Sequence, residues 1–201
     1  MASSKKSKNK VFSSGPSVSK IVETKTLKKG LTLCEDWDLS IDLKLPSQST
    51  SKWGNIFGLQ VEGTANEKPG SRVPAVFTQK SVEHVKLHVS YTPLGAESNH
   101  IYVIPNRFDT GNWINLKISQ NNKLYEIKVD DKVVYKTTNS NPQSWSNVNV
   151  VMGNTYLTTL YYSTAIGEYR NFEVYSCTTT KTTTCILTTS AVISKRLKLL
   201  T

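Results

Sequence analysis

The sequence lacks the features that mark secreted and membrane-spanning chains. The charged start MASSKKSKNK is followed by VFSSGPSVSK, where a secretory leader would need an apolar centre. No apolar run approaches the length of a membrane span, and no Asn-x-Ser/Thr glycosylation acceptor occurs. If Met1 is the true start, these absences predict a cytoplasmic protein.

Cysteine is scarce, and its spacing excludes the common zinc patterns. The chain has three cysteines, Cys34, Cys177 and Cys185, with no CxxC pair. At most one disulfide can form within the chain, and a bond between Cys177 and Cys185 would close only a small loop near the end. We therefore expect free thiols, which favours a reducing compartment.

Motifs for catalysis and metal binding are also missing. There is no G-x-S-x-G nucleophile turn, and the three histidines, His84, His88 and His100, do not form an HExxH site. His84 and His88 lie at i and i+4, but no third ligand accompanies them. We predict no catalytic residues, no metal site and no cofactor.

Positive charge is concentrated at the two ends of the chain. The formal net charge is +10, yet residues 31–176 hold 13 basic and 14 acidic residues. Residues 1–30 hold eight Lys and one Glu, and residues 177–201 hold three Lys and one Arg. Because nucleic-acid binding needs a concentrated basic surface, we expect none through the middle of the chain. We interpret the basic ends as solvated tails.

Alternating apolar residues run through the middle of the chain. Residues 37–45 place an apolar residue at every second position, which is typical of a strand with one buried face. Residues 55–61 are apolar on both faces, which predicts a strand away from a sheet edge. Residues 113–135, WINLKISQNNKLYEIKVDDKVVY, predict three strands joined by tight turns at Asn121-Asn122 and Asp130-Asp131.

The complete pattern predicts one β domain between two tails. We count 10 to 12 short strands and no amphipathic helix, which indicates an all-β, two-layer antiparallel β-sandwich. Residues 1–19 are Ser/Lys-rich and are expected to be disordered. Residues 20–176 are expected to form the sandwich domain. Residues 177–201 are a Thr-rich, low-complexity basic tail, whose apolar end could alternatively lie on a partner or membrane surface.

Several of these segments resemble a known family. The order of these segments resembles that in concanavalin A-like jelly rolls of the laminin-G and pentraxin type. The segments that carry the resemblance are WDLSIDLKL, WGNIFGLQV, GSRVPAVF, NWINLKISQ with LYEIKVDDKVVY, WSNVNVVMG and GEYRNFEVY. It is especially similar to an animal version of that fold, found in extracellular multidomain proteins. That version has a G-x-R-x-P element, which is formed here by Gly70, Arg72 and Pro74. Asp131 stands where the family hairpin usually has glycine. The resemblance implies a jelly-roll fold and an extracellular location.

The resemblance also suggests catalytic and calcium sites that can be compared with the sequence. Glucanases of this fold use an E-x-D-x-x-E arrangement, and the nearest acids, Glu35, Asp36, Asp38 and Asp42, do not have that spacing. We interpret them as a solvated strand face. Calcium sites of the laminin-G type need clustered loop carboxylates and carbonyls, to which Asp109 and Glu97 could contribute, but no cluster stands out.

Galectins are a weaker comparison, because their H-x-N-x-R spacing is not present in HIYVIPNRF. A looser ligand-binding group remains, formed by His88, His100, Tyr102 and Arg107, with Ser90 beside them on an outward sheet face. We therefore expect the site in the strands and loop before residue 113.

The predicted function is a non-catalytic binding or adhesion module for carbohydrate or protein partners. The alternative is a structural or self-associating domain of an extracellular assembly, and a glycan-active enzyme ranks third. The ligand, the use of calcium and the oligomeric state stay open.

Overall fold

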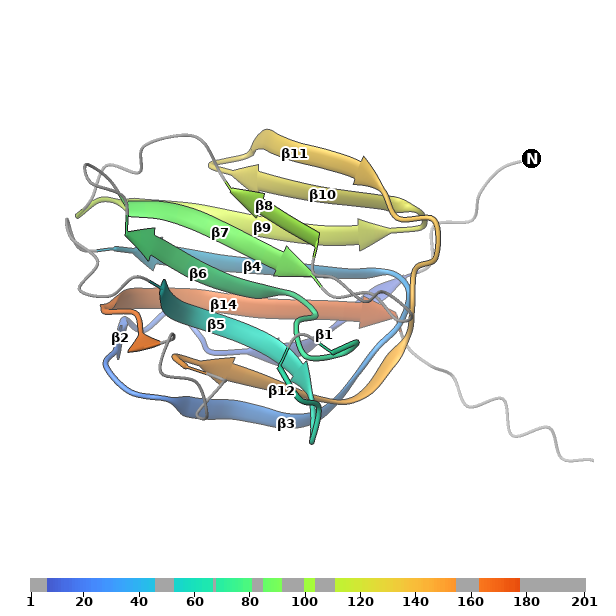
Figure 1. The fold of residues 1–201 in the computed structure, drawn as a ribbon, viewed down its shortest axis with the longest axis horizontal. Coiled ribbons are helices and arrows are strands. Elements are labelled where there is room, and N and C mark those ends of the chain that lie inside the picture. The colour runs from blue at the N-terminus through green and yellow to red at the C-terminus, as the bar shows by residue number, and fades with distance from the viewer. Residues whose placement is uncertain are drawn as a thin grey trace, which may run out of the picture.

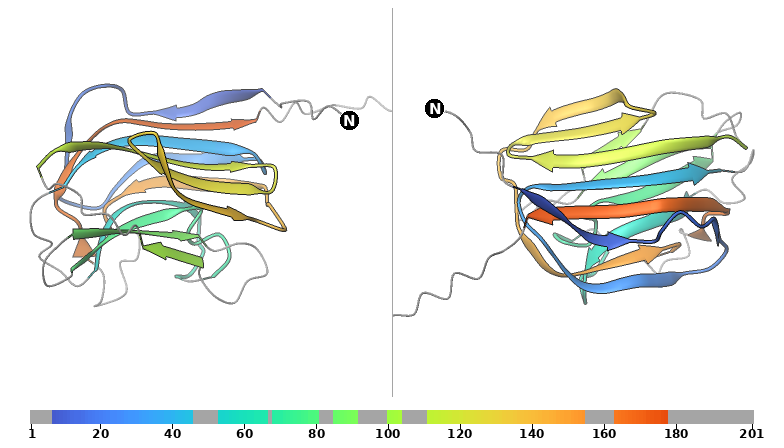
Figure 2. Two further views of the ribbon diagram at one scale, coloured as in Figure 1. Left: turned by 90° about the horizontal axis from the view of Figure 1, so that it is seen from above. Right: turned by 180° about the vertical axis from the view of Figure 1, so that it is seen from behind.

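The alternating pattern folds into fourteen strands, and no helix occurs among the described residues. The computed structural model describes residues 7–45, 53–66, 68–80, 85–91, 100–103, 111–154 and 163–177. The strands form two antiparallel sheets that pack as the two layers of a sandwich, which confirms the predicted fold class (Figure 1; Figure 2, left).

Sheet A contains the predicted meander together with the last strand of the described chain. Its order is β1-β14-β4-β9-β10-β11, and β2 also pairs with β14. The bounds are Lys8–Ser13 for β1, Ser19–Ile21 for β2, Trp37–Lys44 for β4, Trp113–Asn121 for β9, Leu124–Val129 for β10, Lys132–Thr138 for β11 and Gly167–Cys177 for β14.

Sheet B has the order β3-β12-β5-β6-β7-β8, and β13 pairs with β5 in parallel. The bounds are Lys25–Leu33 for β3, Trp53–Val61 for β5, Ala75–Lys80 for β6, Val85–Tyr91 for β7, His100–Val103 for β8, Trp145–Met152 for β12 and Ser163–Thr164 for β13. Strand β5 lies between β12 and β6, as its two apolar faces predict.

The core lies between the inner faces of the two sheets. In β4, buried and half-buried residues alternate without a break, as predicted. Ile41, Leu116 and Ile127 of sheet A are fully buried, and so are Leu59 and Val150 of sheet B. Because side chains alternate along a strand, burial of this set directs the intervening polar residues of sheet A to its outer face.

The turns of the meander adopt the backbone that their residues favour. Asn122 has a φ of 57°, and Asp130 and Asp131 have φ values of 48° and 62°. Asn and Asp tolerate this left-handed region better than other residues with a side chain. The prediction of three strands between residues 113 and 135 is confirmed.

The structure differs from the expectation of a disordered segment over residues 1–19. Strand β1 pairs with β14, and Val11 and Phe12 pack against the core. The Phe12 ring lies edge-on to Phe172, with ring centroids 5.4 Å apart. Two apolar side chains are enough to order this strand because β14 supplies its backbone hydrogen-bond partners. Residues 1–6 and 178–201 of the predicted tails lie outside the described residues.

The expectation of free thiols is wrong for two of the three cysteines. Cys34 and Cys177 form a disulfide, with Cα atoms 5.8 Å apart and a sequence separation of 143. Spacing along the chain could not reveal this pair, because sheet pairing brings the start of β4 beside the end of β14. Disulfides form in oxidising compartments, so the argument for a reducing compartment loses its basis.

Candidate functional site

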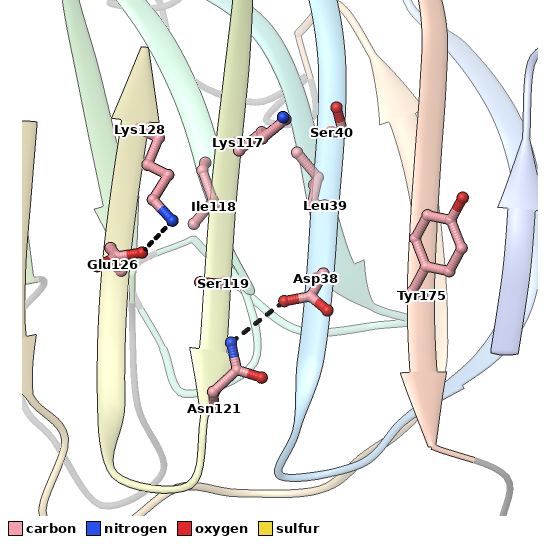
Figure 3. A pocket seen from close by; sticks show the side chains of 10 residues that line it. All are labelled: Asp38, Leu39, Ser40, Lys117, Ile118, Ser119, Asn121, Glu126, Lys128 and Tyr175. Atoms are coloured by element: carbon pink, nitrogen blue, oxygen red, sulfur yellow. Dashed lines mark hydrogen bonds and ion pairs between the residues drawn. The ribbon is translucent and has the colours of Figure 1, made fainter. Parts of the chain in front are cut away.

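A polar hollow lies on the outer face of sheet A, over strands β4, β9, β10 and β14. Its volume is about 390 Å³. Figure 3 shows the lining residues on these neighbouring strands, with polar side chains from all four. The lining residues are Asp38, Leu39, Ser40, Lys117, Ile118, Ser119, Asn121, Glu126, Lys128 and Tyr175.

Strand register explains why these residues meet. Asp38 on β4 lies opposite Ser119 on β9 and opposite Tyr175 on β14. Ser119 in turn lies opposite Glu126 on β10. Directly opposed residues share a sheet face, so one row of polar positions crosses four strands. The small side chain of Ser119 occupies the centre of that row.

The charged groups of the hollow are held by specific partners. Lys8, at the start of β1, donates to Asp38 Oδ2 at 2.8 Å and also to Asn121 Oδ1. Asn121 Nδ2 donates to Asp38 Oδ1 at 3.3 Å (Figure 3). Lys128 and Glu126 form an ion pair of 2.7 Å, and the hydrogen bond with Glu126 raises the pKa of Lys128. These contacts fix the positions of the donors and acceptors in the hollow.

Most charged groups on the outer face of sheet A are ion-paired. Six ion pairs join described residues to one another, and all six lie on this face. They are Lys8–Asp38, Lys10–Glu173, Lys44–Glu168, Lys117–Asp131, Lys128–Glu126 and Arg170–Asp42. Lys20, opposite Glu168, and Lys136, opposite Glu126, share this face without an ion pair among the described residues, so it keeps a small positive excess at β2 and β11.

A second polar cluster lies on the same face beyond Ser40. Asn115 Nδ2 donates to Asp42 Oδ1 at 2.7 Å, and Asn171 Nδ2 donates to Asp42 Oδ2 at 2.8 Å. Arg170 Nε also donates to Asp42 Oδ2, at 3.3 Å, and the guanidinium carbon lies 4.3 Å from the centroid of the Trp113 ring. Asn115 Nδ2 reaches Ser40 Oγ at 3.4 Å, which connects this cluster to the hollow.

The carboxylates of this face with resolved shifts have lowered pKa values. Burial by itself would raise the pKa of Asp42, but hydrogen bonds from Asn115, Asn171 and Arg170 together lower it below 3.8. The hydrogen bond from Lys10, assisted by that from Tyr175, lowers the pKa of Glu173. Both groups therefore stay ionised at neutral pH.

Three of the ligand-binding residues predicted from the sequence, His88, His100 and Tyr102, belong to strands of sheet B and not to the strands that line this hollow. Strands β7 and β8 pair, with His88 opposite Val103, Tyr102 opposite Val89, and His100 opposite Tyr91. The positions of His88 and Tyr102 therefore fall on opposite faces of the sheet. The side chains of His88, His100 and Tyr102 lie outside the described part, as does all of Arg107, so the site stays a prediction.

Ser90 is buried, although the sequence predicts that it lies on an outward sheet face. It is fully buried, and its Oγ accepts a hydrogen bond of 3.0 Å from Arg72 Nη1. Arg72 also donates to Asn66 at 2.9 Å and stacks over Phe77. The outer side of sheet B is thus covered at this point, which alternation along one strand could not show.

Sequence reasoning missed the hollow although part of its signal was visible. The alternation places Asp38 and Asp42 on the outward side of β4, but acids in such a row by themselves predict only a solvated face. Tyr175 and Arg170 could not be added, because only the fold shows that β14 lies beside β4. The outward residues of β9 and β10 belong to the meander, where no site was expected.

The described part of the chain has neither a metal-binding cluster nor a membrane-crossing helix. No group of three or more His, Cys, Asp or Glu side chains there could hold a metal ion. Asp109 and Glu97, the calcium candidates, lie outside the described residues. Within those ranges, no helix has the length and apolar character needed to cross a membrane.

Comparison with solved structures identifies the architecture. A heptameric SAP-like pentraxin from Limulus polyphemus matches with a TM-score of 0.53 and 13% identity, over 86% of this chain and 77% of the pentraxin. Domain 4 of an extracellular arabinanase from Geobacillus stearothermophilus, in complex with arabinotriose, has a TM-score of 0.51 and 13% identity, covering 81% of this chain and 77% of that domain.

A carbohydrate-binding module shows the same likeness. The CBM40 module of a Ruminococcus gnavus IT-sialidase, bound to α2,3-sialyllactose, has a TM-score of 0.51 and 10% identity, covering 79% of this chain and 92% of the module. No family model and no curated protein sequence matches the chain. The chain has the concanavalin A-like jelly-roll fold, as its sequence resemblance implies.

Proposed function

We propose that the chain is a non-catalytic carbohydrate-binding module whose ligand occupies the hollow on the outer face of sheet A. The observation that carries this proposal is the hollow itself, in which charged, hydroxyl and amide groups from four strands surround one concave site. Saccharides present many hydroxyl groups, each of which can donate and accept hydrogen bonds. A site of fixed, mixed donors and acceptors suits that chemistry.

The aromatic ring at the edge of the hollow supports the same proposal. Tyr175 lines the hollow, and its hydroxyl donates to Glu173 Oε2 at 2.7 Å. Lys10 lies over its ring, 5.6 Å from the centroid. A ring held in this way combines apolar surface with neighbouring polar groups, which matches the amphipathic surface of a sugar.

The proteins with the same fold lend support at the level of architecture. The arabinanase domain was solved with arabinotriose and the sialidase module with α2,3-sialyllactose. Their likeness to this chain concerns the fold, so they support saccharide binding as a function compatible with it.

The electrostatics favour binding over hydrolysis. A glycosidase needs one carboxylic acid whose pKa is raised, so that it can protonate the leaving oxygen. Asp42 and Glu173 instead have lowered pKa values and are held by cationic partners. A lyase also shares the fold, so the experiment below includes a product assay.

The direct test is glycan binding by the full chain and by a variant with a filled hollow. Ser119→Tyr places a ring at the centre of the hollow, on a half-buried strand position that tolerates aromatic residues. Thr26→Tyr is the matched control, because it adds the same ring at an exposed position of β3 in sheet B. Arrays are read with calcium and with chelator, a product assay on the incubated glycans detects cleavage, and melting temperatures verify that both variants fold.

We expect the wild type and Thr26→Tyr to bind the same glycans without cleaving them, and Ser119→Tyr to lose at least tenfold in affinity, about 1.4 kcal/mol. A flat array under both calcium conditions would contradict the proposal. If Ser119→Tyr binds normally while Tyr102→Ala or Arg107→Ala does not, the site predicted from the sequence is the correct one.

A further inference from the structure

The outer face of sheet A continues well past the hollow along β4 and β9. Ser119 lies at the centre of the hollow and Trp113 at the other end of the same strand. They are six residue steps apart along the extended strand, a span of about 20 Å at the usual rise per residue. Outward positions between the two are polar, including Ser40, Asp42 and Asn115. This length exceeds what one sugar ring can cover.

Arg170 is presented at the far end of this face in a fixed position. Its Nε atom donates to Asp42, and its guanidinium carbon lies over the Trp113 ring. Both oxygens of Asp42 are occupied by Asn115 and Asn171, so the carboxylate is itself immobilised. The two terminal nitrogens of Arg170 have no hydrogen-bond partner among the described residues, and the side chain is 38% exposed.

Such an arginine is prepared to donate hydrogen bonds to a ligand. A guanidinium normally loses much side-chain freedom when it binds, but stacking and the Asp42 contact have already restricted this one. Its outward N–H groups can reach hydroxyl or ring oxygens. Trp113 is half-buried and supplies apolar surface beside them.

The charge pattern specifies the class of saccharide. Each cation along the path from the hollow to Arg170 is paired with a carboxylate of the same face, while Lys20 on β2 and Lys136 on β11, which have no ion pair among the described residues, lie to either side of it. A charged polymer would gain little long-range attraction from such a balanced surface and would meet carboxylates as often as cations. An uncharged polyhydroxyl chain meets donors and acceptors at every position.

We infer that this face recognises an uncharged oligosaccharide several units long, lying along β4 and β9 from the hollow to the Arg170–Trp113 pair. The inference rests on the proposed function, since it assigns the ligand class and a second contact region to the same site. The hollow binds one end of the chain, and Arg170 contributes only when the ligand is long enough to reach it.

The test is calorimetric titration of the full chain with neutral oligosaccharides of increasing length. Arabino- and cello-oligosaccharides from one to six units serve as probes, together with oligoglucuronates of equal length. Arg170→Gln removes the distal donors, and Lys28→Gln on β3 is the matched control for loss of one exposed cation. Arg170→Lys is the conservative second variant, because it keeps the charge but not the planar donor pair.

We expect affinity for one neutral series to rise with length and then level off. Arg170→Gln should lower the affinity for the longest ligand about tenfold and leave the affinity for the shortest unchanged. A tenfold change corresponds to the loss of one hydrogen bond from a charged group. Lys28→Gln should leave the whole series unchanged, and salt should have little effect.

Two outcomes would overturn the inference while leaving the proposed function intact. One is binding that Ser119→Tyr abolishes but that is independent of ligand length and of Arg170. The other is binding confined to the oligoglucuronates, with affinity that falls steeply as salt is added. Absence of binding to every saccharide would instead remove the proposed function.

Discussion

At the scale of single residues, Asp42 shows how the face of sheet A is kept polar and ordered. Burial opposes its ionisation, but three hydrogen bonds from Asn115, Asn171 and Arg170 outweigh burial and lower its pKa. A group whose pKa is lower in the folded state stabilises the fold when it is ionised in both states. That stabilisation is complete above the ordinary value of 3.8 and is lost as the pH falls through the folded pKa.

The change Asp42→Asn tests this balance. The neutral amide cannot accept the same charged hydrogen bonds, so the free energy of unfolding at pH 7 should fall by about 1 to 2 kcal/mol. The difference from the wild type should shrink on acidification below pH 3.8, where the wild-type carboxylate also becomes protonated. Urea unfolding at a series of pH values measures both effects.

The matched control for this experiment is Glu62→Gln. Glu62 is an exposed carboxylate with no ion pair among the described residues, so its change should alter stability by less than about 0.5 kcal/mol. A difference between Asp42→Asn and wild type that stays constant with pH would show that the carboxylate does not contribute through its charge.

At the scale of elements, strands with complete alternation could be predicted from the sequence. Strands β4, β9 and β10 carry an apolar face that is visible within each segment. Strand β1 offers only Val11 and Phe12, and its stability depends on β14, which is distant in the sequence. The hollow required the same distant pairing, because Tyr175 reaches Asp38 only through the order of sheet A.

Strand β1 should therefore contribute measurably to stability despite its polar composition. A chain that begins at Ser14 loses the pairing with β14, the Phe12–Phe172 contact and the Lys8–Asp38 ion pair. We expect a loss of about 2 to 4 kcal/mol, mainly from the partly buried apolar side chains and the strand hydrogen bonds. The freed edge of β14 should also promote association.

A chain that begins at Ser7 keeps β1 and is the control for this truncation. Chemical unfolding gives the free energies, and light scattering reports association. Equal stability of the two shortened chains would show that β1 is dispensable, as the prediction of a disordered N-terminal tail implies.

At the scale of the whole molecule, the disulfide joins the start of β4 to the end of β14. Cys34 precedes β4 and Cys177 ends β14, so the bond closes a loop across a sequence separation of 143. Cys34 N also donates to Ser176 Oγ at 2.9 Å. A crosslink of this span restricts the unfolded chain strongly and holds β14, which supplies Tyr175 and Arg170, beside β4.

Removing this bond should therefore affect stability more than it affects the local structure of the site. The double change Cys34→Ser with Cys177→Ser should lower the free energy of unfolding by about 2 to 4 kcal/mol, the usual range for a native disulfide. Reductant should lower wild-type stability similarly and leave the double variant unchanged.

Cys185→Ser, which leaves the crosslink in place, is the control and should match the wild type. If Cys185→Ser were instead as destabilising as the double variant, a bond to Cys185 would be the important one. If the double variant is less stable but still binds its ligand below its melting temperature, strand pairing alone is sufficient to assemble the face of sheet A.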